Sequence, residues 1–167
     1  MRKSIIALIL IISIFTIGCS REENEFIRNN KDKMKDTIDL VLSYENGYDD
    51  TMKKYISEEN FIGSNFMEFY TAYIGEVEIQ DFKSKIVSVR EAEDGRYLAS
   101  TVIDIKALST ESHTHADGSV HEGGHEVAGE DIPVEIVLLE KDGEFYIEGF
   151  TGYESLEKAK ELNEGFR

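Results

Sequence analysis

The sequence predicts an α+β fold: helices first, then a four-stranded antiparallel sheet, then one closing helix. Up to about residue 75, apolar residues recur at helical spacing, and from about residue 77 they alternate with a period of two. Two Asp-Gly turn signals divide the extended region into two hairpins. Because helices and strands are segregated along the chain, we expect an α+β domain.

Three helices are expected before the sheet. The first covers residues 25 to 44, where apolar residues fall on one face. A shorter second helix is expected over 49 to 56, capped by one of the aspartates at its start. The third lies in the segment SNFMEFYTAYIGE, residues 64 to 76, whose aromatic residues follow helical spacing. The segment EENF, residues 58 to 61, is the only candidate for a strand between these helices.

Two hairpins and a last helix are expected after the third helix. The first hairpin covers residues 82 to 109 and turns at EDGR, and the second covers 132 to 150 and turns at KDGE. Pro133, the only proline, is expected near a strand start, where a missing N–H is tolerated. One face of the second strand is predicted to hold Tyr97, Ala99, Ile103, Ile105 and Ala107. The last helix, about 154 to 163, carries Leu156, Ala159 and Leu162.

The N-terminal residues predict export and lipid anchoring. Residues 1 to 18 have the basic start and short apolar run of a secretory signal peptide. The TIGC that follows this run resembles a bacterial lipobox, although Thr16 stands where leucine is usual. The resemblance implies that Cys19 is diacylated and becomes the new N-terminus. Residues 19 to 24 then form a tether, and residues 25 to 167 form a single domain with a His-rich loop at 110 to 130.

Cysteine usage and charge agree with this prediction. Cys19 is the only cysteine, so no intramolecular disulfide can form. A lone free thiol is unusual in an exported protein because oxidising compartments trap it, and acylation of Cys19 would leave no free thiol. The alternatives are an ordinary secreted protein or an uncleaved anchor helix. The whole chain has a formal charge of −16, and because residues 1 to 18 hold two basic residues and no acid, the rest carries −18. Such a surface disfavours nucleic acid and attracts cations and basic partners.

The order of elements, from the first helix to the second hairpin, resembles the nuclear transport factor 2-like, or cystatin-like, cone found in many small bacterial lipoproteins. The resemblance covers about residues 25 to 152 and is architectural. It implies a curved sheet around a pocket. Some members of the family catalyse reactions in that pocket, and others only bind or assemble, so the fold does not choose between these functions.

All four histidines lie in the segment HTHADGSVHEGGHE, residues 113 to 126. His113 and His115 form an H-x-H pair, whose side chains point to the same side of an extended chain. His121 and His125 have the H-x3-H spacing seen in zinc sites. A turn at Asp117 would fold the two pairs toward each other. The sequence therefore predicts a divalent metal site, most simply for Zn²⁺, with these four histidines as ligands.

Carboxylates surround the predicted site. Asp117, Glu122 and Glu126 are expected to accept imidazole N–H groups or to replace a ligand. Binding should weaken below about pH 6.5, where free imidazole protonates. Two alternatives remain: a loop without fixed structure, which binds metal weakly because ordering costs about 1–2 kcal/mol per residue, and an acid-sensing loop. The loop alone is similar to those of zinc-scavenging surface lipoproteins, which implies metal acquisition or buffering.

The sequence does not predict an enzyme. A cone-pocket base would have to be a residue such as Asp104, Tyr70 or Tyr73. Asp104 alternates with apolar residues and is expected to face solvent, and the tyrosines belong to an aromatic helix stripe. The alternative function is a cone-shaped protein-interaction or small-ligand-binding module, with a membrane or surface protein as partner.

Overall fold

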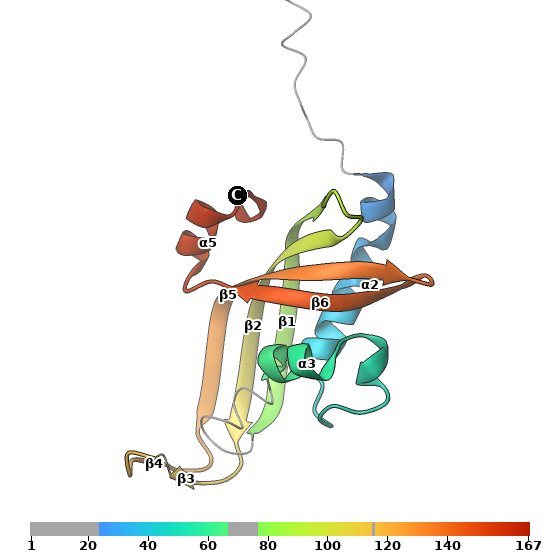
Figure 1. Ribbon diagram of the computed structural model, residues 1–167. Coiled ribbons are helices and arrows are strands. Elements are labelled where there is room, and N and C mark those ends of the chain that lie inside the picture. Colours follow the sequence, from blue (N-terminus) through green and yellow to red (C-terminus); the bar gives the residue numbers. More distant parts are fainter. Residues whose placement is uncertain (1–23, 67–76, 115) are drawn as a thin grey trace, which may run out of the picture.

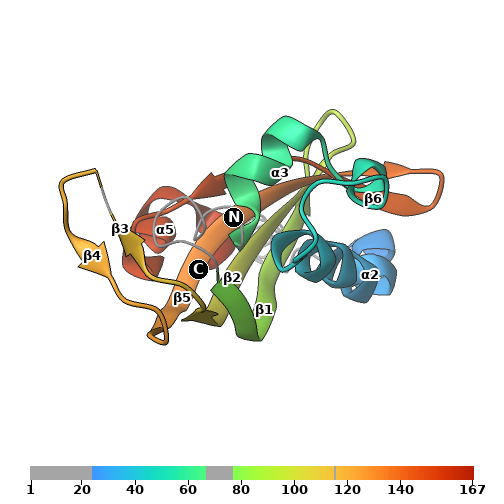
Figure 2. The ribbon, with the colours of Figure 1, turned by 90° about the horizontal axis from the view of Figure 1, so that it is seen from below.

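The computed structural model of the chain describes residues 24–66, 77–114 and 116–167. Helices pack against a four-stranded antiparallel sheet, so the predicted α+β class is confirmed (Figures 1 and 2). The described helices are α2 (Glu25–Leu42), α3 (Glu58–Ser64) and α5 (Leu156–Leu162), with single 3-10 turns η1 (Met52–Lys54) and η2 (Glu164–Phe166). The strands are β1 (Val77–Glu91), β2 (Tyr97–Ser109), β3 (His113–Thr114), β4 (Val120–His121), β5 (Glu126–Lys141) and β6 (Glu144–Gly152).

Helix α2 forms as the periodicity predicts and covers one face of the sheet. Its N-cap is Asn24, whose side chain accepts a hydrogen bond from the Phe26 N–H at 2.9 Å. The helix ends at Leu42, two residues earlier than expected. Its apolar stripe is buried over its whole length, and the stripe consists of Ile27, Met34, Ile38, Val41 and Leu42. Burial of each such side chain contributes about 1.5–3 kcal/mol, which fixes α2 on the sheet.

The connection between α2 and the sheet differs from the prediction. The expected helix over 49 to 56 is only the 3-10 turn η1, whose N-cap position is Thr51 and not an aspartate. The Asp49 carboxylate accepts the N–H groups of Thr51 and Met52 just before this turn. Residues 58 to 61, the only candidate for an early strand, are helical and begin α3.

Local chemistry explains why 58 to 61 is helical. Ser57 accepts the Asn60 N–H as an N-cap, and two glutamates in the first turn complement the helix dipole. Phe61 is fully buried, which holds the short helix on the core. The third expected helix lies largely outside the described residues: Phe66 is helical, and residues 67–76 are not described.

Both predicted hairpins are present. Strand β1 pairs with β2, and β5 pairs with β6, with positive φ at the turn glycines Gly95 and Gly143. Strands β2 and β5 pair antiparallel, so the sheet order is β1-β2-β5-β6. The predicted buried face of β2 is confirmed, since its five members are all buried: Tyr97, Ala99, Ile103, Ile105 and Ala107.

Strand β5 changes direction along its length (Figure 1). The register between β2 and β5 shifts between Ile103 and Ile105, which indicates a bulge at this point. Opposite it, Asp131 has a φ of 52° and donates its N–H to the Asp104 carboxylate at 2.8 Å. The bulge therefore marks where the second half of β5 and its partner β6 leave the direction of β1 and β2.

Pro133 does not lie near a strand start, because it is in the middle of β5. Its carbonyl accepts the Tyr153 N–H at 3.1 Å, just beyond the last β5–β6 pair at Gly152. The N and C=O of one residue point to the same side of an antiparallel strand. The proline nitrogen thus faces the side on which β6 has ended, so the sheet loses no ladder bond.

The C-terminal helix is shorter than expected and contacts the sheet differently. Ser155 caps α5, and Ala159 is buried as predicted. Leu162 was expected to share the helix stripe, but 66% of it is exposed. Phe166 of η2 is buried instead, because the chain turns back onto the sheet directly after α5.

Candidate functional site

The His-rich segment forms a small hairpin. Strand β3 pairs antiparallel with β4, and His113 and His121 are directly opposed Cα partners. The turn predicted at Asp117 is present. Its carboxylate accepts the Ser119 N–H at 2.9 Å and the Ser119 hydroxyl at 2.6 Å, and Gly118 has a φ of 85°. The predicted turn thus brings His113 of the first pair opposite His121 of the second.

The base of the hairpin is tied to the end of β2. The Gly124 N–H donates to the Ser109 carbonyl at 2.7 Å, and the Ser109 N–H donates to the His125 carbonyl at 3.0 Å. Gly124 has a φ of 86°, a conformation that favours glycine. The Gly123 N–H donates to the Ser112 hydroxyl at 3.2 Å. These bonds hold the hairpin as a projection from the sheet (Figures 1 and 2).

The structure places the four predicted ligands unequally. His113 and His121 are paired through their backbones, and His125 is exposed beside the hairpin base. The side chains of His113 and His121, and the whole of His115, lie outside the described part of the structure. Among the side chains that are described, no group of three or more His, Cys, Asp or Glu could hold a metal ion.

The three predicted accessory carboxylates have different roles. Asp117 holds the hairpin turn through Ser119, so its oxygens already accept two hydrogen bonds. Glu122 is exposed next to β4. Glu126, the first residue of β5, lies with its carboxylate 3.5 Å from the Lys106 ammonium, and both side chains are largely exposed.

Sequence reasoning missed the serines that shape this hairpin. Ser119 completes the turn, and Ser112 and Ser109 hold its base. A signal was present, because Asp-x-Ser is a sequence that forms local side-chain to backbone hydrogen bonds.

The other candidate residues do not form a site in the described structure. Asp104 is exposed as expected, and its carboxylate holds the backbone of Asp131 at the β5 bend. Tyr70, Tyr73 and Cys19 lie outside the described residues. Within residues 24–66, 77–114 and 116–167, no helix has the length and apolar character needed to cross a membrane.

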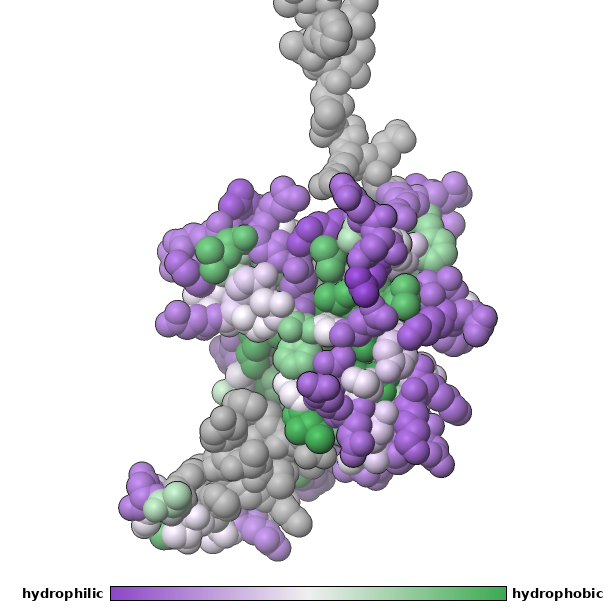
Figure 3. Space-filling model, viewed as in Figure 1, coloured by the Kyte–Doolittle hydropathy of each residue, from purple (hydrophilic) through white to green (hydrophobic). Residues whose placement is uncertain are grey.

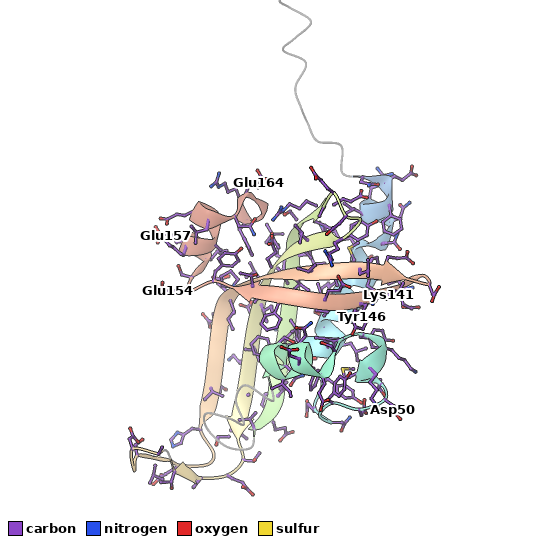
Figure 4. All side chains as sticks on the ribbon, viewed as in Figure 1. Asp50, Lys141, Tyr146, Glu154, Glu157 and Glu164 are labelled. Atoms are coloured by element: carbon purple, nitrogen blue, oxygen red, sulfur yellow. The ribbon has the colours of Figure 1, made fainter. Side chains whose placement is uncertain are left out.

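Acidic side chains are also found far from the hairpin. Figure 4 shows Glu154, Glu157 and Glu164 around the C-terminal helix, at the other end of the sheet from β3 and β4. On the β5–β6 hairpin, Lys141 places its ammonium 3.8 Å from the centre of the Tyr146 ring. The strong negative charge is therefore distributed over the surface, and the His-rich hairpin is only one part of it.

Comparisons with known proteins add little. No protein-family model matches the chain, and no curated protein matches it in sequence. The chain is similar to one solved structure, described as the crystal structure of the intermembrane space region of chloroplast protein ARC6. The TM-score is 0.43 at 10% identity, over 78% of this chain and 95% of that one. A likeness of this degree carries no information about function.

Proposed function

We propose that this chain is a lipid-anchored protein of the extracytoplasmic membrane face that binds a divalent metal, in the first place Zn²⁺, through His113, His115, His121 and His125. The observation that carries the proposal is the direct pairing of His113 with His121 in the β3–β4 hairpin. The proposed role is metal acquisition or buffering at the cell surface.

The pairing favours a shared ion for a geometric reason. Directly opposed residues of an antiparallel pair lie on one face, with Cβ atoms about 4.5–5.5 Å apart. Imidazole nitrogens bind zinc at about 2.0–2.1 Å, so two rings that start this close can reach one ion. The proposal takes His115 as a further ligand because it follows His113 with the H-x-H spacing of the sequence. His125, whose backbone is fixed by Ser109, completes the proposed set.

Asn24, the first described residue, and the His-rich hairpin lie at opposite ends of the sheet (Figure 1). The described chain begins at Asn24, five residues after Cys19, at the end of the molecule away from β3 and β4 (Figure 1). Strand β2 spans 13 residues between these ends, which at about 3.3 Å per residue is about 40 Å. An acylated Cys19 would therefore hold the hairpin well clear of the membrane, accessible to a basic-surfaced membrane or surface protein partner.

The cone-like shape is part of the same proposal. Its support is the bulge between β2 and β5 and the change of direction at Asp131. Closure of the sheet around α2 and α3 would make the inner face a pocket, as in the family that the sequence resembles.

Zinc titration by isothermal calorimetry tests the metal site. A chain from Ser20 to Arg167 contains every described contact. We expect a sub-micromolar dissociation constant and a zinc-dependent rise in melting temperature. His113→Ala and His121→Ala should each weaken binding at least about tenfold, since each removes one ligand.

Glu111→Gln is the matched control, because it removes a charge at the hairpin base and leaves every imidazole in place. It should change the affinity by less than about threefold. A dissociation constant near millimolar that neither histidine substitution alters would contradict the proposal. Metabolic labelling with palmitate, lost in Cys19→Ala, tests the anchor separately.

A further inference from the structure

Residues 153–167 cross the face of the sheet that is turned away from α2, and we call this segment the C-terminal strap. It comprises α5 and η2 and packs on β1, β2 and β5. Figures 1 and 2 show α5 and α2 on opposite sides of the sheet. The strap follows β6 directly after Gly152, where an added Cβ would meet no atom within 4 Å. Its connection to the sheet is therefore not closely packed.

Contacts within the strap give it a shape of its own. The Arg167 guanidinium donates from Nε to the Lys160 carbonyl at 2.7 Å, which ties η2 back to α5. The Asn163 side-chain amide donates to the Tyr153 hydroxyl at 2.9 Å. The Tyr153 and Phe166 rings meet edge to face, with their centres 5.4 Å apart. The strap can therefore keep its internal contacts when it moves.

The strap buries little apolar surface on the sheet. Helix α5 buries only the small side chain of Ala159, and its Leu162 is largely exposed. Figure 3 shows a mostly hydrophilic surface over this part of the molecule. The larger apolar contact comes from Phe166, so the hydrophobic effect contributes less here than it does along α2.

Polar contacts form much of the attachment. The Ser88 hydroxyl of β1 donates to the Gly165 carbonyl at 2.7 Å, and the Asn163 amide donates to the Glu135 carboxylate of β5 at 2.6 Å. In water each such bond contributes modestly, because the separated groups bind water instead. These contacts close the strap without making its release costly.

The closed strap also covers a polar atom that has no partner. Gly165 lies directly over the Ser100 side chain, so closely that an added Cβ would clash with Oγ. The Ser100 hydroxyl is fully buried and makes no hydrogen bond in the structure as described. Burial of such a group is unfavourable, and the hydroxyl can bind water again once Gly165 moves away. This contact therefore favours the open strap.

We propose that the C-terminal strap opens and closes as one unit about Gly152 while the rest of the domain stays folded. It acts as a lid over a polar strip of three adjacent strands, and the open state exposes Ser88, Ser100 and Glu135 to water. Segments with few buried apolar contacts are those that open locally in native proteins.

Amide hydrogen exchange measured by NMR on the chain from Ser20 to Arg167 tests the proposal. The α5 amides, such as those of Ala159 and Asn163, should exchange at least about a hundredfold faster than the amides of the β2–β5 ladder, after correction for their intrinsic rates. Urea below the unfolding transition should speed exchange in the ladder much more than in α5, because local opening exposes little surface.

Two serines of β1 give a matched pair of variants. The Ser88 hydroxyl contacts the strap, whereas the Ser84 hydroxyl donates to the Asp39 carboxylate of α2 on the opposite face. Ser88→Ala should speed exchange of the α5 amides about three- to tenfold, and Ser84→Ala should leave it unchanged. Ser100→Ala should slow it about twofold, since the closed strap then covers no unpartnered hydroxyl. Thermal melts confirm that each variant is folded.

Three results would overturn the proposal. Equal protection of α5 and the β2–β5 ladder would mean that the strap is released only by global unfolding. A similar increase in both serine variants would mean the same. Fast α5 exchange that Ser88→Ala does not alter would mean that the helix frays in place and that the strap does not lift from the sheet.

Discussion

Replacement of Gly165 by alanine should destabilise the protein by about 1–3 kcal/mol, and removal of the Ser100 hydroxyl should restore most of the loss. Gly165 lies in η2, the turn that brings the C-terminus back onto the sheet. A Cβ added there would lie well under 3.0 Å from the Ser100 Oγ, 3.1 Å from the Ser88 Oγ and 3.2 Å from the Asn163 Oδ1. The site has room for a hydrogen atom and no more.

The size of the expected destabilisation follows from the hydrogen bonds that η2 would lose if it moved away from the sheet. The Gly165 carbonyl accepts the Ser88 hydroxyl at 2.7 Å, and its N–H donates to the Asn163 side chain at 2.9 Å. Each of these hydrogen bonds contributes about 0.5–1.5 kcal/mol. Displacement of the turn loses both, and if the turn stays in place, overpacking costs a similar amount.

Urea unfolding of four proteins measures the effect: wild type, Gly165→Ala, Ser100→Ala and the double variant. Ser100→Ala alone should be neutral or slightly stabilising, because the Ser100 hydroxyl is buried and has no partner in the part of the chain described. The double-mutant cycle should then give a coupling energy of about 1–2 kcal/mol.

Gly129→Ala is the control for the clash. An added Cβ there would lie 2.5 Å from the Ile132 Cδ1, the end of a flexible side chain that can rotate away. Gly129→Ala should therefore destabilise the protein less than Gly165→Ala does. If Gly165→Ala is as stable as wild type, or if Ser100→Ala fails to reduce its cost, the close approach of η2 to the sheet is not as the structure has it.

Three further outcomes are expected. Asn65→Ala should cost about 2–4 kcal/mol in urea unfolding, because it leaves two backbone carbonyls without their buried donor. Asp117→Ala should weaken zinc binding about three- to tenfold and speed amide hydrogen exchange in the hairpin, with global stability nearly unchanged. Hydrogen bonds from the Tyr44 hydroxyl and the Met52 N–H hold the pKa of Asp49 below its ordinary value of 3.8. Its stabilising contribution is therefore present above that value and lost as the pH falls through the lower folded pKa, and Asp49→Asn should flatten the acid side of the stability profile.

The sheet was predictable because its signals are local. Asp-Gly turns fix where each hairpin reverses, as at Gly95 and Gly143, and alternation fixes which face of β2 is buried. The first helix was predictable for the same reason, since its apolar stripe needs only the 3.6-residue period.

Most errors in the predicted fold arise where residues distant in the sequence determine the local structure. The place of Pro133 inside β5 depends on where β6 ends, which the residues around the proline do not show. Leu162 follows helical spacing, but Phe166 takes the contact with the sheet because η2 turns back. Helix α3 is an exception, because its signal, the Ser57 cap, is local but weak next to the aromatic pattern that follows it.

In the candidate site, the turn could be predicted and the register could not. The sequence suggested two separate histidine pairs, H-x-H and H-x3-H. It also predicted that a turn would fold the pairs toward each other, and the structure shows which residues are then opposed: His113 and His121. That register is set by the Asp117–Ser119 turn and by the backbone hydrogen bonds that Ser109, at the end of β2, makes with Gly124 and His125.

The hydrogen-bonded hairpin affects how tightly its histidines can bind a metal ion. In a loop without fixed structure, a metal must also supply the cost of ordering the chain, about 1–2 kcal/mol per residue, so four histidines bind weakly. Here the bonds at Asp117, Ser109 and Gly124 form as part of folding and already fix the backbone. If zinc binds as proposed, it has only side chains to order, and the affinity should depend on each imidazole and on the turn that aligns them. That dependence distinguishes a preformed metal site from a flexible segment that is rich in histidines. The metal affinity of such a flexible segment falls only in proportion to the number of imidazole rings removed.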